Sequence, residues 1–423
     1  MKSAEYQIFN LTANFTETIR DPLWKDIPLS SGFKKLFLSE PMQKLNRIKQ
    51  LGPTYLLYPG ALHNRASHSL GVFHLTRLII LSLLSRSSGY GIIPSFTDSQ
   101  INALLAASML HDLGHFPYAH ALKDIVKEEH EKLGATLIKQ DAQLCSIIEE
   151  DLNSSVDAVC QIIDNKSECN DEVIIFFRTI LSGTLDPDKL DYLSRDALFC
   201  GVPYGVQDAS YIIRNLVVTK EMILALPFEA IGSVEHLLFA KYSMYRNVYW
   251  HHVTRSATAM IKKAVLLAFK ENLFSEKDLY NLDDESFANL FSNHKESYSY
   301  SLFKDVRNNH LYKCHASLYS SLDSSMKKEI EKELYTRLLK EIPNLKEHQV
   351  IVDIPEKVSF ETDLPILIEN NELRPFNQVT DLFKAEVESA FASSLTKVRL
   401  FLPQRFVIDN KNKLLKEILS KYE

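Results

Sequence analysis

Residues 97–115 read TDSQINALLAASMLHDLGH, and this stretch decides how the chain is interpreted. Thr97 and Gln100 form a capping-box pattern, which predicts a helix that begins near Ile101 and ends near Leu110. The next two residues are His111 and Asp112. Adjacent His and Asp side chains reach one metal ion only where the backbone bends, and Gly114 stands just beyond them. Imidazole with carboxylate suits Mn²⁺, Fe²⁺, Ni²⁺ or Mg²⁺ better than a metal that selects thiolates, although most His-Asp pairs are ordinary helix ends.

The composition is that of an ordinary globular protein. The chain has 423 residues, 45% of them hydrophobic and 24% charged, with a net charge of −6. These values exclude a largely disordered chain and argue against a broad basic surface for nucleic acid. No secretory signal and no apolar run of about 20 residues is visible, and the 5 cysteines have no metal-binding spacing. We therefore expect a cytoplasmic protein that does not span a membrane.

Helical periodicity dominates the first two thirds of the chain. We expect irregular structure over residues 3–38, an isolated hairpin near residues 216–220 and strands only late in the chain. The predicted helices cover residues 64–84, 101–110, 128–140, 173–182, 187–198 and 233–270, and the predicted strands cover residues 349–354, 365–368 and 398–402. The fold class is therefore mainly α. We expect a helical bundle over residues 1–275 and a smaller α+β appendage over residues 276–423.

Two further stretches carry chemistry-bearing side chains. His68 stands on an otherwise apolar helix face, where a lone histidine is usually a core residue with satisfied hydrogen bonds. Residues 186–196 read DPDKLDYLSRD. Asp191 and Arg195 are explained as an ion pair four residues apart on a helix, whereas Asp188 is not so easily explained. Seven of the chain's 14 histidines lie between residues 63 and 130.

The order His68, His111-Asp112, Asp188 resembles the ligand order of the HD-domain phosphohydrolases. The stretches 50–52, 58–65, 67–72, 111–120 and 188–196 are similar to one branch of that family, the dNTP triphosphohydrolases with a sterile alpha motif and an HD domain, and their bacterial relatives. The resemblance covers residues 18–270 strongly and the rest of the chain weakly. It implies a helical HD domain.

The resemblance also implies roles for individual residues. His68, His111, Asp112 and Asp188 would hold one divalent metal ion (Mn, Fe, Ni, Mg or Zn), with further Mg²⁺ possible on the triphosphate. His115, His120 and His130 would handle protons and contact phosphate, with His120 as the acid that protonates the departing 5′ oxygen. Substrate would be bound by Arg65 and Lys189 at the triphosphate, and by the residues Gln50, Leu51, Tyr192, Asp196, Lys241 and Tyr249.

The chain departs from the pattern of this branch in several places. Lys241 stands where the animal enzymes carry arginine, and Lys123 stands where an acidic residue of the proton-handling group is expected, with Asp124 beside it. Leu38 and Asn46 replace the residues that read an activating guanine nucleotide, so activation of that kind is not expected. We expect no sterile alpha motif, because the segment before the resembling stretch is too short to hold one.

The implied activity is metal-dependent hydrolysis of a dNTP to a deoxynucleoside and inorganic triphosphate, by attack of water on the α-phosphorus. Two alternatives stay open. One is an HD phosphohydrolase that acts on another nucleotide or on a nucleic-acid phosphoester, and the other is a nucleotide sensor with weak or no catalysis. The expected partners are the dNTP and other copies of the chain, as a dimer or tetramer; nucleic acid is possible but less favoured.

Overall fold

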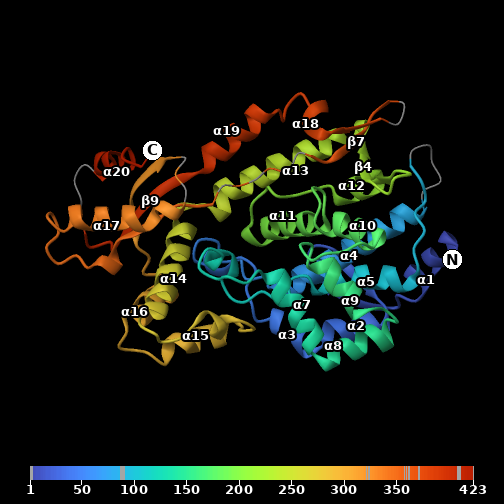
Figure 1. The fold of residues 1–423 in the computed structure, drawn as a ribbon, viewed down its shortest axis with the longest axis horizontal. Coiled ribbons are helices and arrows are strands. Elements are labelled where there is room, and N and C mark those ends of the chain that lie inside the picture. Colours follow the sequence, from blue (N-terminus) through green and yellow to red (C-terminus); the bar gives the residue numbers. More distant parts are fainter. Residues whose placement is uncertain are drawn as a thin grey trace.

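The structure is a computed structural model. It describes residues 3–85, 91–320, 322, 324–356, 358, 360, 363–369, 372–406 and 411–422. The described chain is mainly helical, with small sheets, as the sequence predicts (Figure 1).

Helices build the N-terminal two thirds. The helices up to residue 200 are α1 (Ala4–Ala13), α2 (Ser31–Leu38), α3 (Glu40–Leu45), α4 (Arg65–Ser85), α5 (Asp98–Leu110), α6 (Ala119–Leu122), α7 (His130–Gln140), α8 (Ala142–Ser146), α9 (Val156–Ile163), α10 (Glu172–Leu181) and α11 (Pro187–Cys200). The later helices are α12 (Ala209–Asn215), α13 (Ile231–Met244), α14 (His252–Lys270), α15 (Asp284–Ser292), α16 (Tyr298–Arg307), α17 (Lys327–Leu338), α18 (Phe376–Val379), α19 (Ala385–Leu395) and α20 (Lys411–Leu419).

The centre of the bundle is formed by α4 and α5, which pack against each other and are buried along most of their length. The predicted capping box at Thr97 is present and starts α5 one turn early, at Asp98. By length and apolar composition alone, α4 is also long enough to cross a membrane. Its 18-residue apolar window is 72% buried inside the fold, as in a core helix, so this criterion is weak evidence for a membrane span.

The strands form three small sheets. They are β1 (Glu17–Asp21), β2 (Lys25–Leu29), β3 (Val217–Val218), β4 (Leu224–Pro227), β5 (Lys313–Tyr319), β6 (Ile351–Asp353), β7 (Pro365–Leu367), β8 (Leu373–Pro375) and β9 (Lys397–Leu402). β1 and β2 make an N-terminal hairpin, β3-β4-β7-β8 make a mixed sheet, and β5-β9-β6 make an antiparallel sheet. The three predicted late strands are confirmed as β6, β7 and β9, whereas β5 and β8 were not predicted.

Three local predictions are wrong. Residues 3–38 are not irregular, because they contain α1, the β1–β2 hairpin and α2. The helix expected over residues 233–270 is broken: a π-helical segment, Tyr245–Tyr249, and the turn at Trp250 separate α13 from α14. The β3–β4 hairpin exists but is not isolated, because β4 pairs in parallel with β7 from the C-terminal region.

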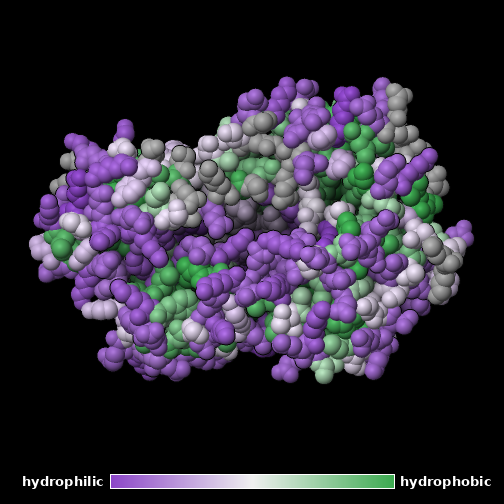
Figure 2. Space-filling view, in the orientation of Figure 1, coloured by the Kyte–Doolittle hydropathy of each residue, from purple (hydrophilic) through white to green (hydrophobic). Residues whose placement is uncertain are grey.

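Hydrophobic clusters cross residue 275. One cluster joins Phe116 and Ala257 with Phe287 and Phe303, so α14 packs against α16 through a shared apolar core. The half-buried Arg255 on α14 donates through Nε to Asp353 Oδ2 of β6 at 2.9 Å. The division at residue 275 stays a prediction from composition. Figure 2 shows a mostly hydrophilic face with separate apolar patches.

Candidate active site

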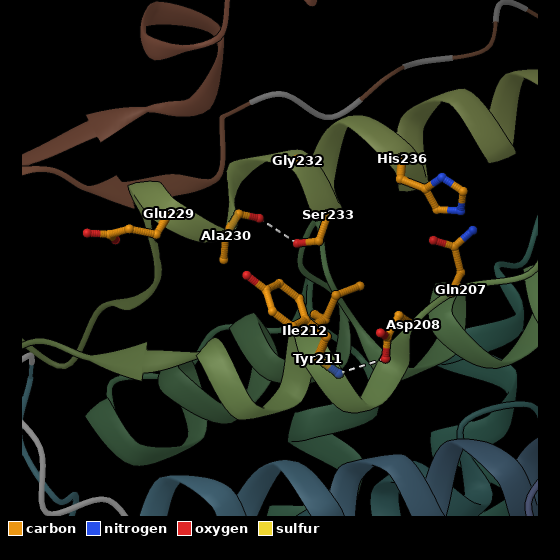
Figure 3. A pocket seen from close by; sticks show the side chains of 9 residues that line it. All are labelled: Gln207, Asp208, Tyr211, Ile212, Glu229, Ala230, Gly232, Ser233 and His236. Carbon is orange, nitrogen blue, oxygen red and sulfur yellow. Dashed lines mark hydrogen bonds between the residues drawn. The ribbon is translucent and has the colours of Figure 1, made fainter.

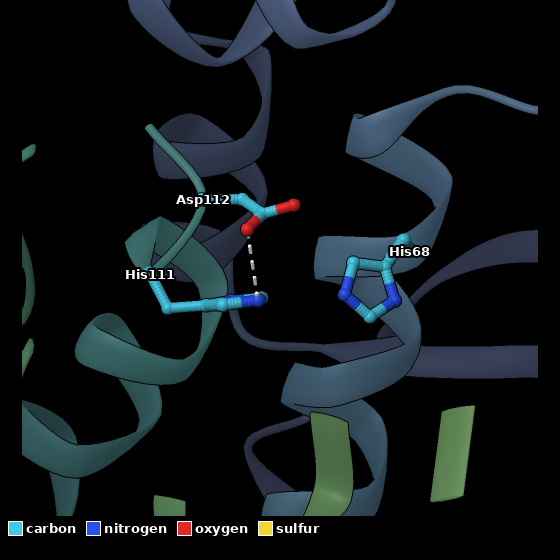
Figure 4. A group of neighbouring side chains, drawn as sticks. All are labelled: His68, His111 and Asp112. Atoms are coloured by element: carbon cyan, nitrogen blue, oxygen red, sulfur yellow. Dashed lines mark ion pairs between the residues drawn. The ribbon is translucent and has the colours of Figure 1, made fainter. Parts of the chain in front are cut away.

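Three of the predicted metal ligands meet between α4 and the end of α5. His68 projects from the first turn of α4, while His111 and Asp112 follow the last residue of α5 (Figure 4). One ligand atom from each of His68, His111 and Asp112 lies within 4.8 Å of the others. Two imidazole nitrogens and one carboxylate oxygen so close together form a donor set for a divalent metal ion.

The predicted backbone bend explains how neighbouring residues face one point. His111 is the C-cap of α5, and two tight turns follow, in which Leu113 N donates to Leu110 O and His115 N donates to Asp112 O, each at 2.9 Å. His111 Nδ1 lies 2.9 Å from Ser108 O, which leaves Nε2 toward Asp112 Oδ1 at 3.4 Å. The pairing of Nδ1 with a carbonyl sets the tautomer in which Nε2 has its lone pair available.

Asp188 completes the set from the first turn of α11. Its Oδ1 lies 2.9 Å from His68 Nε2 and 3.8 Å from His111 Nε2. Burial disfavours the charged form of His68, but its hydrogen bonds with Asp188 and Asp191 outweigh burial and raise its pKa to about 10. The proton between His68 and Asp188 thus stands where a cation bound by both side chains would sit.

The residues present fit a metal ion. His111 Nε2 is buried and has no hydrogen-bond partner in the described part of the chain, although it points at two carboxylates. Burial alone would raise the pKa of Asp112, yet its interactions with His115 and with the Arg65 guanidinium hold it well below its ordinary value, so Asp112 is available as an anionic ligand.

Arg65 borders this cluster at the start of α4. It is 3% exposed, and its Nη1 donates to Asp112 Oδ2 at 2.7 Å. Its Nε is buried and makes no hydrogen bond among the residues that the structure describes. A buried guanidinium N–H without an acceptor is costly, so Arg65 presents an open donor beside the metal cluster.

The three predicted catalytic histidines lie together. The ring centroid of His115 is 3.9 Å from that of His130 and 4.9 Å from that of His120. The approach of α7 to the turn after Asp112 brings them together, and it requires glycine at residue 114, where a Cβ would lie 2.0 Å from His130 O. The His115 ring is linked to the metal cluster, since its Nδ1 lies 3.2 Å from Asp112 Oδ1.

Burial keeps this trio uncharged. Burial and then the Arg65 charge lower the pKa of His120 to about 3 and hold the pKa of His115 well below its ordinary value. Burial also lowers the pKa of His130, whose Nε2 lies 3.1 Å from Glu131 Oε1. Glu131 is an acidic neighbour of the trio that sequence reasoning missed, although it follows His130 directly.

A second polar group lies further along α11. Asp188, Tyr192 and Asp196 are four residues apart and therefore share one face of α11, about 12 Å from end to end. Asp196 Oδ1 lies 2.8 Å from His63 Nε2, and Asp196 Oδ2 accepts a hydrogen bond from Tyr249 Oη at 2.6 Å. The π-helical segment that breaks the expected long helix ends at Tyr249.

Gln50 and Leu51 lie beside this group. Residues 48–50 pair with residues 63–65: Gln50 N donates to His63 O, and Arg65 N donates to Ile48 O, each at 3.0 Å. Gln50 Oε1 is buried without a partner in the described chain, and Leu51 is half-buried against the core.

The structure does not place Lys189 and Lys241 as open phosphate-binding groups. Lys189 Nζ donates to Gly183 O at 2.9 Å and to Asp186 Oδ2 at 2.5 Å. Lys241 is 6% exposed and lies 5.8 Å from the ring centroid of Phe360. Lys189 must exchange the Asp186 carboxylate for phosphate if it is to bind substrate.

In the described part of the structure, Lys123 and Asp124, which follow His120 in the sequence, do not contribute to a proton relay with it. Lys123 is exposed. Asp124 pairs with Lys262 of α14, so its carboxylate is already neutralised. Neither side chain is linked to His120 by a hydrogen bond within the described residues.

A separate cavity of about 280 Å³ lies between α12 and the start of α13 (Figure 3). Its lining includes the carboxylates of Asp208 and Glu229 and contains no lysine or arginine within the described chain. Because like charges repel, this cavity is unsuited to a triphosphate, and none of the metal-cluster residues lines it.

Comparison with known proteins identifies the architecture. Residues 65–176 match the family described as HD domain, and residues 207–401 match the HD associated region. The chain is 32% identical to the uncharacterized protein YwfO of Bacillus subtilis over 62% of its own length and 56% of that protein. It is 26% identical to the deoxynucleoside triphosphate triphosphohydrolase SAMHD1 of Homo sapiens over 60% of its own length and 44% of that protein.

The chain thus spans about half the length of these curated relatives. The crystal structure of a phosphohydrolase from Bacteroides thetaiotaomicron has the same fold, with a TM-score of 0.71 and 24% identity over 91% of this chain and 99% of that one.

The match to the HD domain and the His-Asp cluster identify the chain as an HD-domain protein with a candidate metal site. Within that class, the two family matches and the similarity to SAMHD1 fit the SAMHD1-like branch of the HD-domain phosphohydrolases, as the resemblance of its motifs predicted.

Proposed function

We propose that this protein hydrolyses deoxynucleoside triphosphates to deoxynucleoside and inorganic triphosphate. The observation that carries the proposal is the single face of α11, which runs from Asp188 at the metal cluster to Asp196 at the Tyr249 hydroxyl. A nucleotide laid along this face has its phosphates at the cluster and its sugar at Asp196. The similarity to named triphosphohydrolases supports the same substrate class.

His68, His111, Asp112 and Asp188 would hold the divalent metal ion. When bound, such an ion neutralises phosphate charge and supplies an activated water near neutral pH. Arg65 is placed to bind a phosphate oxygen through its unpartnered Nε while Nη1 keeps Asp112 in place. The guanidinium therefore orients both a metal ligand and the substrate.

The histidine trio would supply the proton for the leaving 5′ oxygen. In the absence of substrate, burial keeps His120 neutral. A bound triphosphate adds negative charge beside the imidazole and raises its pKa toward the range that suits a general acid. His130, in contact with Glu131, would hold the proton until the bond to the leaving oxygen breaks.

Selection for deoxyribose would fall to the group around Asp196. Tyr249 and His63 hold both of its carboxylate oxygens, so Asp196 is fixed in one orientation. Gln50 and Leu51 would pack beside the sugar and exclude a 2′-hydroxyl.

The deciding experiment is a product assay. Purified protein is incubated with each dNTP and Mn²⁺ or Mg²⁺, and the products are separated by ion-exchange chromatography. Triphosphate plus deoxynucleoside supports the proposal, whereas monophosphate plus pyrophosphate refutes it. Asp112→Asn should abolish turnover, and Asp26→Asn, which alters an exposed carboxylate far from the cluster in sequence, should not.

One observation favours a second candidate, an HD phosphohydrolase that acts on another phosphoester. Lys189 and Lys241 are engaged inside the fold and not directed to phosphate, so the grip on a triphosphate is weaker than the resemblance implies. Nucleoside monophosphates and single-stranded oligonucleotides in the same assay discriminate the two. Assembly as a dimer or tetramer also remains a proposal, which light scattering coupled to size exclusion tests.

A further inference from the structure

We infer that Trp24 and Asp21 of the N-terminal hairpin are positioning residues of the metal centre, acting on the ligand His68 through Asp191. The inference rests on the metal site of the proposed function and goes beyond it. It makes the β1–β2 hairpin, whose turn lies more than 40 residues before the first ligand, a working part of the site.

Asp191 is the carboxylate behind His68. It is fully buried, and its Oδ2 lies 2.8 Å from His68 Nδ1, on the opposite side of the ring from the metal cluster. Because an ionised carboxylate only accepts, His68 Nδ1 carries the proton and Nε2 faces the cluster. A carboxylate in this place fixes the ring orientation and raises the basicity of the ligand nitrogen.

The hairpin holds Asp191 from the other side. Trp24 Nε1 donates to Asp191 Oδ1 at 2.5 Å. Arg195 donates to both oxygens, through Nε to Oδ2 at 2.8 Å and through Nη2 to Oδ1 at 2.9 Å. Both carboxylate oxygens therefore accept N–H groups, and the position of Asp191 relative to His68 is determined by Trp24 of the hairpin and Arg195 of α11.

Asp21 anchors this arrangement to the hairpin turn. It receives Arg195 Nη1 at 2.7 Å through Oδ2, and its Oδ1 accepts the backbone N–H groups of Leu23 and Trp24 at 2.9 and 2.8 Å. The Asp21 carboxylate thus stabilises the turn that orients the Trp24 indole, and it also pairs with the Arg195 guanidinium that binds Asp191.

The side chains of Asp191 and Arg195 pack closely against α4, the helix that carries His68. At Gly71, one turn after His68 on α4, a Cβ would lie 1.8 Å from Asp191 Oδ1 and 2.6 Å from Arg195 Nη2. Asp191 and Arg195 are pressed directly against the α4 backbone. A shift of the hairpin is therefore transmitted to Asp191 and from there to the imidazole.

The test is metal affinity, measured without nucleotide. Trp24→Phe removes the N–H donor and keeps an aromatic ring. We expect its dissociation constant for Mn²⁺, from isothermal titration of full-length apoprotein, to rise roughly 3- to 10-fold, below the 10- to 100-fold typical when a partner in direct contact with a ligand is lost. Trp250→Phe, at the only other tryptophan, is the matched control and should leave the constant unchanged.

A merely structural role for Trp24 predicts loss of thermal stability with unchanged metal affinity, and that result overturns the inference. With the diamagnetic ion Zn²⁺ bound, the ¹⁵N shift of His68 Nδ1 gives a second readout, and it should differ between Trp24→Phe and wild type. Should Trp24→Phe not fold, Asp21→Asn is measured against Asp26→Asn on the same hairpin, and equal affinity of these two overturns the inference. Wild type that binds Mn²⁺ without hydrolysing dNTPs would refute the proposed function alone.

Discussion

Gly71 gives the sharpest mechanical test of the site. In Gly71→Ala the new Cβ would lie 1.8 Å from Asp191 Oδ1, whereas real Cβ atoms essentially never approach closer than 3.0 Å. The Asp191 carboxylate must therefore move by more than about 1 Å, and its contacts are all buried. Overpacking costs ~1–3 kcal/mol, and damage to a buried ion pair costs up to ~3–5 kcal/mol.

Alanine has a better helix propensity than glycine by ~1 kcal/mol, which offsets part of that loss. We expect a net loss on the order of 3 kcal/mol in the free energy of unfolding. Because the displaced carboxylate holds His68, we also expect weaker Mn²⁺ binding. Urea unfolding followed by circular dichroism and isothermal titration with Mn²⁺ measure the two effects.

Gly232→Ala is the matched control. Gly232 also lies in a helix, α13, but a Cβ there meets nothing within 4 Å, so only the propensity gain remains. We expect this variant to be as stable as wild type or slightly more stable. An unfolding midpoint and a metal affinity of Gly71→Ala equal to those of Gly232→Ala would refute the packing argument.

Three further outcomes follow from the same contacts. Asp186→Asn removes the charge that holds Lys189, so KM for a dNTP should fall roughly 2- to 5-fold with little change in kcat, as measured by steady-state kinetics. Asp353→Asn removes the buried carboxylate that pairs with Arg255 and should cost ~3–5 kcal/mol near pH 7 in urea unfolding. Burial opposes the charge of Asp353, but Arg255 outweighs burial and lowers its pKa; the stabilisation is present above pH ~4 and disappears as the pH falls further, so the two proteins should converge in acid. Mn²⁺ at about 100 times its dissociation constant should stabilise wild type by ~2.7 kcal/mol in thermal unfolding and leave Asp112→Ala unchanged.

Much of the fold could be predicted because its signals are local. The capping box at Thr97 and the periodicity of residues 64–84 specify helices through contacts three and four residues apart, and both helices are present. The break at Tyr245–Tyr249 could not be predicted in this way. A π-helical turn has no local sequence signal here, and its contacts, such as Tyr249 with Asp196, join distant segments.

The candidate site also has features that the sequence predicted and features that it did not. The bend after Leu110 follows from the sequence and brings His111 and Asp112 to one point. Lys189 and Asp186 are only three residues apart, yet the sequence did not predict their ion pair. Residue spacing does not show which side-chain rotamer the burial of Asp186 favours.

The sequence by itself determined the helical class, the family and the candidate ligands, since these depend on periodicity and on short ordered motifs. Only the tertiary structure decided what surrounds them. Trp24 reaches Asp191 across 167 positions, and β4 pairs with β7 across a similar separation. Such contacts arise where buried donors and acceptors must find partners in one close-packed interior, and a linear pattern does not specify those partners.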